Sequence, residues 1–195
     1  MDWQPCAVVI GGPNGAGKST AASTLLTDLF DPIEFVNADE IARVLTGLEE
    51  NTRNLRAGRL MLAKLEELAG KRADFAFETT LASRSFAPWL ERLQRERSYR
   101  VIVMYLWLPT VDHAVTRVRD RAARGGHDVP EIIIRRRYFN GLKNFFNLYM
   151  RLADQWILYD NSSSTPQAVA TGYRDGTLDV RRPNIWDSVR KQAND

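Results

Sequence analysis

The residues with the clearest chemistry lie near the N-terminus, where a glycine-rich segment leads into a lysine and two hydroxyl side chains. They fit the pattern G-x-x-x-x-G-K-[ST] and are Gly12, Pro13, Asn14, Gly15, Ala16, Gly17, Lys18, Ser19 and Thr20. Glycines let the backbone wrap around phosphate oxygens, so that amide groups and the N-terminus of the following helix converge on them. In such a loop Lys18 reaches the β- and γ-phosphates, and the Ser19 hydroxyl ligates Mg²⁺. The sequence therefore predicts a site for ATP and Mg²⁺.

Acidic residues follow two further apolar segments and are candidates for catalysis and metal binding. Asp39 comes after one of them, and Glu78 ends another, just before Thr79 and Thr80. Open α/β sheets bind ligands at the carboxyl ends of their strands, where we expect both carboxylates. Asp39 is predicted to orient an acceptor hydroxyl and take its proton, and capping of the helix that it opens is the alternative. Glu78 is predicted to hold Mg²⁺ through water or to contact the substrate, and the alternative is a capping residue before a loop.

A third candidate region is rich in arginine, since seven of the 21 residues from Arg117 to Arg137 are arginine. Arg117, Arg121 and Arg124 follow one another at helical spacing on one stripe. Gly125-Gly126 then forms a joint, and a second helix carries Arg135–Arg137. Like charges at this spacing repel, and a polyphosphate would compensate the repulsion. The pattern predicts a lid that closes over ATP, with a solvated basic face or a nucleic-acid patch as the alternatives.

Apolar runs alternate with helical patterns, which is typical of βα units and a parallel sheet. The predicted strands are 7–11, 34–37, 75–77, 100–108 and 155–159, and the predicted helices are 18–30, 39–45, 53–72, 85–97, 111–124 and 130–153. We therefore expect an α/β P-loop NTPase of the kinase type, with a mostly parallel five-stranded sheet, helices on both faces and an arginine-rich helical lid at about 117–137. Residues 1–195 are predicted to form a single domain. A hairpin is expected within 167–182, and the tail beyond Asn184 is expected to be a short helix or disordered.

The composition limits the classes of protein to which the chain can belong. Its 195 residues are 44% hydrophobic and 26% charged, with a net charge of +3, which is typical of a globular protein. No apolar run approaches the length of a transmembrane helix, and no secretory signal precedes the first strand. The one cysteine, Cys6, opens an apolar strand and is predicted to be a small buried hydrophobe. These features favour a cytoplasmic protein with no membrane contact.

The motifs, taken in order, resemble a known family. They are Gly11–Thr20, Asn37–Ala42, Phe77–Thr80, Arg124–Pro130, Arg136–Tyr138 and Tyr159–Ser162. Together they are similar to the zeta-toxin family of P-loop kinases, and more narrowly to its short chromosomal branch, which is often labelled predicted ATPase. The resemblance covers residues 7 to about 162.

The resemblance implies a kinase that phosphorylates a sugar hydroxyl of UDP-N-acetylglucosamine, or of another nucleotide-sugar, and that is restrained by an antitoxin protein. By position, it makes Asp39 the general base and Glu78, Thr79 and Thr80 the substrate contacts, with Ser19 and Glu78 at the metal. Asn161 would border the adenine. The chain is shorter than the long toxins, and its lid reads Gly-Gly-His where better-known toxins carry an arginine. The arginines that could stabilise the transferring phosphate beside Lys18 are Arg121, Arg124, Arg136 and Arg137.

Three functions follow from these observations. The first is a Mg²⁺- and ATP-dependent kinase acting on a small hydroxyl-bearing molecule. The second is a nucleotide-dependent ATPase switch that phosphorylates no acceptor. The third is a nucleic-acid kinase or binder that uses residues 117–137, which ranks last because no aromatic platform for stacking accompanies the arginines.

Overall fold

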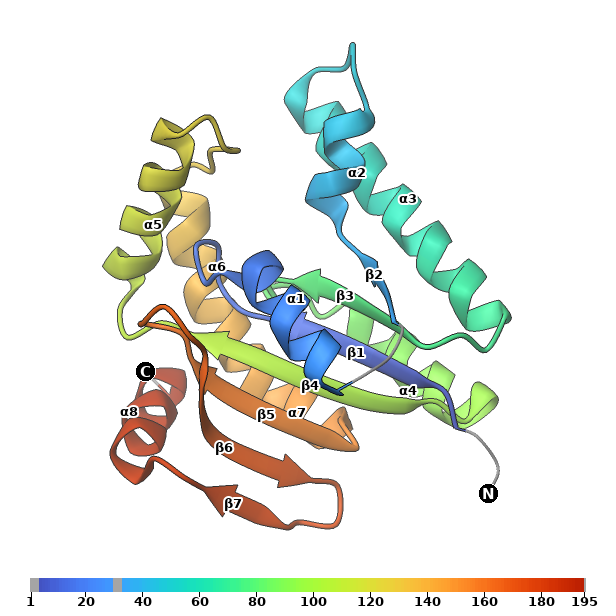
Figure 1. Cartoon of the computed structure of the whole chain (residues 1–195), viewed down its shortest axis with the longest axis vertical. Coiled ribbons are helices and arrows are strands. Elements are labelled where there is room, and N and C mark those ends of the chain that lie inside the picture. Colours follow the sequence, from blue (N-terminus) through green and yellow to red (C-terminus); the bar gives the residue numbers. More distant parts are fainter. Residues whose placement is uncertain (1–3, 30–32, 195) are drawn as a thin grey trace.

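The fold is built around one seven-stranded sheet. The computed structural model of the chain describes residues 4–29 and 33–194. The strands are β1 (Cys6–Gly11), β2 (Glu34–Val36), β3 (Phe75–Thr79), β4 (Arg100–Trp107), β5 (Gln155–Asp160), β6 (Gln167–Tyr173) and β7 (Leu178–Val180). Their order across the sheet is β2-β3-β1-β4-β5-β6-β7 (Figure 1). The pairs from β2 to β5 are parallel, whereas β6 pairs antiparallel with both β5 and β7.

Helices cover both faces of the parallel strands. They are α1 (Lys18–Leu29), α2 (Ala38–Val44), α3 (Glu50–Gly70), α4 (Phe86–Arg97), α5 (Val111–Ala123), α6 (Glu131–Asn144), the π-helical turn η1 (Phe145–Tyr149), α7 (Met150–Leu152) and α8 (Pro183–Asn194). Successive side chains of β1 alternate between two hydrophobic clusters. Ala7 and Val9 pack with side chains of α3, α4 and α8, and Val8 and Ile10 pack with side chains of α1 and α5. A strand that is covered on both faces must be apolar throughout, as β1 is.

The predicted fold class, an α/β fold with a mostly parallel sheet and helices on both faces, is confirmed. The sheet has two strands more than the predicted five, because the hairpin expected within 167–182 joins the sheet as β6 and β7. Buried Val169 and Ala170 of β6 explain this position, since their side chains belong to the same hydrophobic cluster as Ala7 and Val9. The tail beyond Asn184 forms most of α8, which buries Trp186 and Val189.

One predicted helix is interrupted. The stretch from Pro130 to Ala153 forms α6, η1 and α7 in succession instead of one continuous α-helix. A π-helical turn holds an extra residue, which changes the direction of the side chains that follow it. The apolar stripe stays buried but is divided between the two clusters: Ile134 and Tyr138 belong to one, and Leu142, Phe145, Tyr149 and Leu152 belong to the other. The predicted end of the first helix, Phe30, lies outside the described residues.

The arrangement places two helical arms on opposite sides of the carboxyl ends of the parallel strands. Figure 1 shows α2 and α3 rising on one side, next to β2, and α5 with α6 on the other side. Across residues 4–29 and 33–194, no helix is both long and apolar enough to cross a membrane.

Candidate active site

The P-loop joins β1 to α1 and has the backbone conformation that phosphate loops require. Gly12, Gly15 and Gly17 have φ angles of 145°, 79° and 75°, which side chains strongly disfavour. A Cβ atom on Gly12 would lie 2.5 Å from the carbonyl oxygen of Leu106, and one on Gly15 would lie 2.6 Å from that of Ala114. The glycines are therefore needed both for the turn and for close contact with β4 and α5.

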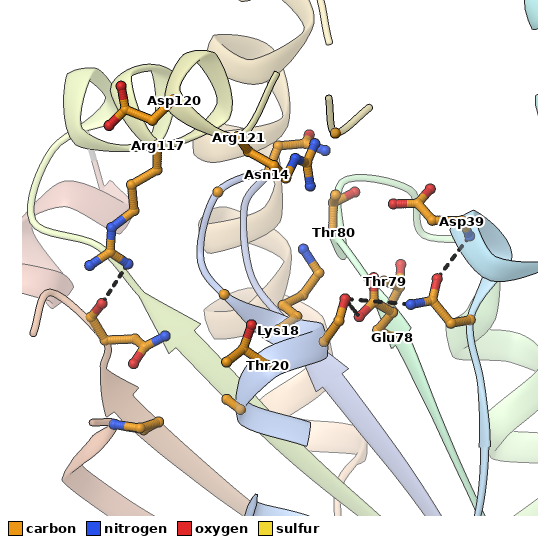
Figure 2. Close-up of a pocket in the computed structure, with 18 of the residues that line it drawn as sticks. Asn14, Lys18, Thr20, Asp39, Glu78, Thr79, Thr80, Arg117, Asp120 and Arg121 are labelled. Carbon is orange, nitrogen blue, oxygen red and sulfur yellow. Dashed lines mark hydrogen bonds between the residues drawn. The ribbon is translucent and has the colours of Figure 1, made fainter. Parts of the chain in front are cut away.

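Lys18 is the buried cation of this loop. Its side chain is only 8% exposed, and its Nζ donates a hydrogen bond to the carbonyl oxygen of Pro13 at 3.0 Å. Burial lowers the pKa of Lys18, whereas the negative charges of Glu78 and Asp39 raise it. Figure 2 shows the Lys18 side chain between Asp39 on one side of the pocket and Arg117 on the other. The carboxylates of Asp39 and Glu78 thus lie close enough to the P-loop to act electrostatically on its lysine.

Ser19 and Glu78 form the part of the site that fits a magnesium ion. The Ser19 hydroxyl donates to a carboxylate oxygen of Glu78 at 2.7 Å, and Asn37 Nδ2 donates to the same hydroxyl at 3.4 Å. The part of the chain that the structure describes holds no group of three or more His, Cys, Asp and Glu side chains that could ligate a metal. Mg²⁺ commonly uses one or two protein oxygens together with substrate phosphates and water. The Ser19–Glu78 pair fits that mode.

Asp39 is not the N-cap of α2. Asn37 is the cap, because its side-chain Oδ1 accepts a hydrogen bond from the backbone N–H of Asp39 at 2.8 Å. The alternative that Asp39 serves only as a helix cap is therefore wrong. Its carboxylate lies in the first turn of α2 and lines the cavity (Figure 2). It is free to act on a ligand.

Thr79 ends β3, and Thr80 opens the loop after it, which is held in a strained conformation. Leu81 is fully buried and has a φ of 54°, which is rare for a bulky residue. The hydroxyl oxygens of Thr79 and Thr80 accept hydrogen bonds from the backbone N–H groups of Leu81 and Ala82. These bonds close two tight turns, which direct the threonines to the cavity that they line.

Residues of α6 and η1 fix this loop from the other side. Buried Asn144 donates to the carbonyl oxygen of Leu81 at 2.8 Å, and the Tyr149 hydroxyl donates to that of Ser83 at 3.1 Å. Gly141 lets the helix approach, since a Cβ there would lie 2.3 Å from the carbonyl oxygen of Thr80. These positioning residues were not predicted from the sequence, because they lie more than 60 positions away from the loop in the chain.

The predicted arginines separate into two groups. Arg121, Arg124 and Arg137 line the cavity, and Arg137 donates to the side chain of Asn14 in the P-loop at 3.3 Å. Burial, assisted by the charge of Arg136, lowers the pKa of Arg137, and Asp39 raises it. Arg136 itself is exposed and is not among the cavity-lining residues, so its predicted catalytic role has no support in the geometry. The physical reason is helical phase: adjacent residues of α6 point in different directions.

Arg117 also lines the cavity, and its guanidinium holds the loop after β5. Its guanidinium donates to the carbonyl oxygens of Asn161 and Ser162 at 2.8 and 2.9 Å. Asn161 is buried, and its side chain donates to the carbonyl oxygen of Ala16 at 2.6 Å. The loop predicted to border adenine is thus joined to the P-loop on one side and to α5 on the other.

All these elements surround one cavity of about 1100 Å³. Its lining includes the P-loop, Asp39, Glu78, Thr79, Thr80, the lid arginines Arg121, Arg124 and Arg137, and Asn161. It also includes residues that the sequence analysis did not single out, namely Arg43, Met61, Asp120 and Ser163–Pro166. Arg43 and Met61 come from α2 and α3, which carry no recognisable motif after Ala42.

Comparison with known proteins agrees with this geometry. The profile of the family described as AAA domain (AAA_33) matches residues 8–137, which is more than half of the chain. The chain belongs to the AAA_33 family. The match runs from β1 through the P-loop to Arg137, so it contains both arms of the cavity. The remaining elements of this AAA_33 protein, from Tyr138 to α8, lie outside the match.

A relative in Haemophilus influenzae, an uncharacterized protein, is 27% identical over 135 residues, which are 68% of this chain and 91% of that protein. Among solved structures, AvrRxo1-ORF1 in complex with AvrRxo1-ORF2 superposes with a TM-score of 0.73 at 15% identity over 96% of this chain. The chain spans 64% of the length of that protein. A further structure of this pair was solved with ATP.

Two more solved structures have the same fold. The PezAT chromosomal toxin–antitoxin system of Streptococcus pneumoniae gives a TM-score of 0.64 at 16% identity, over 100% of this chain and 87% of that one. A putative kinase from Chloroflexus aurantiacus gives 0.56 at 16% identity, over 66% of this chain and 74% of that one. At these identities the likeness establishes the fold, which is that of nucleotide-binding P-loop kinases.

Proposed function

We propose that this protein is a phosphotransferase that moves the γ-phosphoryl group of ATP to a hydroxyl group of a small molecule, with UDP-N-acetylglucosamine or another nucleotide-sugar as the first candidate. The observation that carries the proposal is the place of Asp39. Its carboxylate lines the same cavity as the P-loop, is not used as a helix cap, and acts electrostatically on both Lys18 and Arg137. A carboxylate in that position can orient an acceptor hydroxyl and take its proton.

The chemistry follows from the side chains around the cavity. The acceptor hydroxyl donates its proton to Asp39 as its oxygen attacks the γ-phosphorus, and the bond from that phosphorus to the bridging oxygen of ADP breaks. Lys18 and the lid arginines Arg121, Arg124 and Arg137 offset the negative charge that spreads over the transferred group. Ser19 and Glu78 would hold a magnesium ion, whose positive charge would neutralise part of the charge of the phosphates.

The nucleic-acid alternative has less support from the arginine segment than its composition suggests. Arg117 is used by backbone carbonyls, and Arg119 and Arg135 form ion pairs with Glu131, while Arg135 also pairs with Asp112. The arginines that are left, apart from exposed Arg136, line the cavity. They fit a polyphosphate in a pocket better than an extended backbone on a surface.

A restraining partner protein is part of the proposal. Two of the proteins with the same fold come from pairs, the AvrRxo1-ORF1:AvrRxo1-ORF2 complex and the PezAT toxin–antitoxin system. On this likeness, and on the motifs shared with zeta toxins, we expect an antitoxin-like partner. Co-purification of a neighbouring gene product with the tagged chain would test it.

Incubation of the purified protein with γ-labelled ATP and a metabolite extract tests the kinase proposal. We expect a new labelled small molecule that is missing when Lys18→Ala is used as the blank. Asp39→Asn should lower its formation by about 10²- to 10⁴-fold, because general base catalysis contributes that much, while ATP affinity stays nearly unchanged. Slow ATP hydrolysis with no labelled product, or wild-type transfer by Asp39→Asn, would contradict the proposal and favour the ATPase switch.

A further inference from the structure

One arginine of the cavity is not explained by the transfer of a phosphoryl group. Arg43 lies in the last turn of α2 and lines the cavity, four residues after Asp39. Residues four apart lie on the same side of a helix, one turn from each other. At a rise of about 1.5 Å per residue, the two side chains start about 6 Å apart along the helix axis. Arg43 therefore lies on the same side of the cavity as Asp39. We call this the acceptor side, because Asp39 is the proposed base for the acceptor hydroxyl.

The guanidinium of Arg43 is not used by the described part of the protein. Within residues 4–29 and 33–194, no carboxylate lies in ion-pair range of Arg43, and no hydrogen bond is formed by its side chain. Arg43 is exposed and lines the cavity, so a ligand can reach its side chain. Arg43 thus presents five N–H donors to whatever occupies the cavity.

Arg43 also lies apart from the point of phosphoryl transfer. The positive charges that lower the pKa of Lys18 are those of Arg121 and Arg137, and Arg43 is not one of them. Figure 1 shows why: α2 starts beside β2 and runs away from the sheet, so that its last turn lies farther from the P-loop than its first turn. The triphosphate already has Lys18 and three lid arginines around it. Arg43, which lies beyond Asp39, is therefore available to bind a group other than the triphosphate.

The cavity also has an apolar contact to offer. Met61 of α3 lines it with a side chain that is only 4% exposed and belongs to the same hydrophobic cluster as Ala7 and Val9. A polarizable thioether suits contact with the carbon skeleton or ring of a small molecule. Besides the P-loop and the lid, the cavity thus offers the carboxylate of Asp39, the thioether of Met61 and the guanidinium of Arg43.

We infer that Arg43 is a specificity-determining residue that binds an oxyanion, a phosphate or a carboxylate, on the acceptor. The acceptor is then an alcohol that carries an anionic group besides its reacting hydroxyl. The hydroxyl gives its proton to Asp39, and the guanidinium holds the anion with two parallel N–H donors. This inference rests on the proposed function, which it refines.

Fractionation of the metabolite extract on an anion exchanger tests the charge of the acceptor. Each fraction is incubated with the wild-type protein and γ-labelled ATP, and Lys18→Ala serves as the blank. We expect labelled product only from the retained, anionic fraction. Product from the neutral flow-through would overturn the inference but leave the kinase intact, whereas no Lys18-dependent product in any fraction would overturn both.

The nature of the anion and the role of Arg43 need two further measurements. Loss of acceptor activity after the retained fraction is treated with a phosphatase, which is then removed, indicates a phosphate monoester; survival indicates a carboxylate or a phosphodiester. Arg43→Gln should raise the KM for the acceptor about 10- to 100-fold, as loss of a hydrogen bond to a charged group does, with kcat and the KM for ATP changed much less. Arg43→Lys should recover part of the loss.

Arg56→Gln is the matched control, because Arg56 is an exposed arginine of α3 on the same arm that does not line the cavity. It should behave as wild type. Equal KM values for the acceptor in wild type and Arg43→Gln would remove Arg43 from the binding site, even if the acceptor is anionic.

Discussion

The two sides of the cavity are built in different ways. The ATP side is one continuous segment, from Gly12 to Thr20, whose shape is set by backbone angles and by close contacts of glycines with β4 and α5. The acceptor side combines α2, the middle of α3 and the loop after β3, and side-chain hydrogen bonds hold it together. The first side is therefore sensitive to added atoms, and the second side to lost hydrogen bonds.

On the ATP side, ATP affinity should fall sharply when a single carbon atom is added to the P-loop. Gly12→Ala places a Cβ 2.5 Å from the Leu106 carbonyl at a φ of 145°, so the loop must move. Because a displacement of about 1 Å in a positioning element costs about 100-fold, we expect ATP affinity to fall by that factor or more in a calorimetric titration. Gly58→Ala is the control, since nothing lies within 4 Å of that site in α3. A Gly12→Ala protein with normal ATP affinity would show that the loop is not rigid.

Substitutions of two adjacent arginines of the lid should have different effects. Arg137 lines the cavity and contacts Asn14, whereas Arg136 is exposed. We expect Arg137→Gln to lower kcat for phosphoryl transfer about 100-fold, as removal of one donor to a developing charge does, and Arg136→Gln to stay within about twofold of wild type. Equal losses in both variants would mean that the lid turns about its axis when it closes.

On the acceptor side, loss of a positioning hydrogen bond should have a smaller effect on substrate binding. Asn144→Ala removes the hydrogen bonds to the carbonyl oxygens of Leu81 and Ala82 and leaves buried acceptors unpaired. We expect the free energy of unfolding in urea to fall by about 1–3 kcal/mol. The KM for the acceptor should rise several-fold with the KM for ATP unchanged.

Exposed Asn140, one turn earlier on α6, provides the control through Asn140→Ala. Loss of stability in Asn144→Ala with an unaltered KM for the acceptor would show that Asn144 supports the fold but does not position the loop.

Sequence alone determined the parts of this protein that depend on neighbours in the chain. The P-loop was predictable because its function needs glycines, a lysine and a hydroxyl in consecutive positions, and the parallel sheet because strands buried on both faces must be apolar throughout. Asp39 and Glu78 were predictable as residues at the ends of such strands. The catalytic roles assigned to these residues are still predictions.

Tertiary structure alone decided which side chains reach the cavity. Successive residues of a helix point in directions about 100° apart. Which of Arg136 and Arg137 faces the cavity therefore depends on how α6 packs, and the apolar stripe of α6 alone did not decide it. Asn37 took the capping role from Asp39 through a hydrogen bond that the spacing did not reveal. Arg43, Met61, Gly141 and Asn144 entered the site because contacts between distant segments brought α2, α3 and α6 to the end of β3. Such contacts depend on how whole elements pack, which no local pattern of residues records.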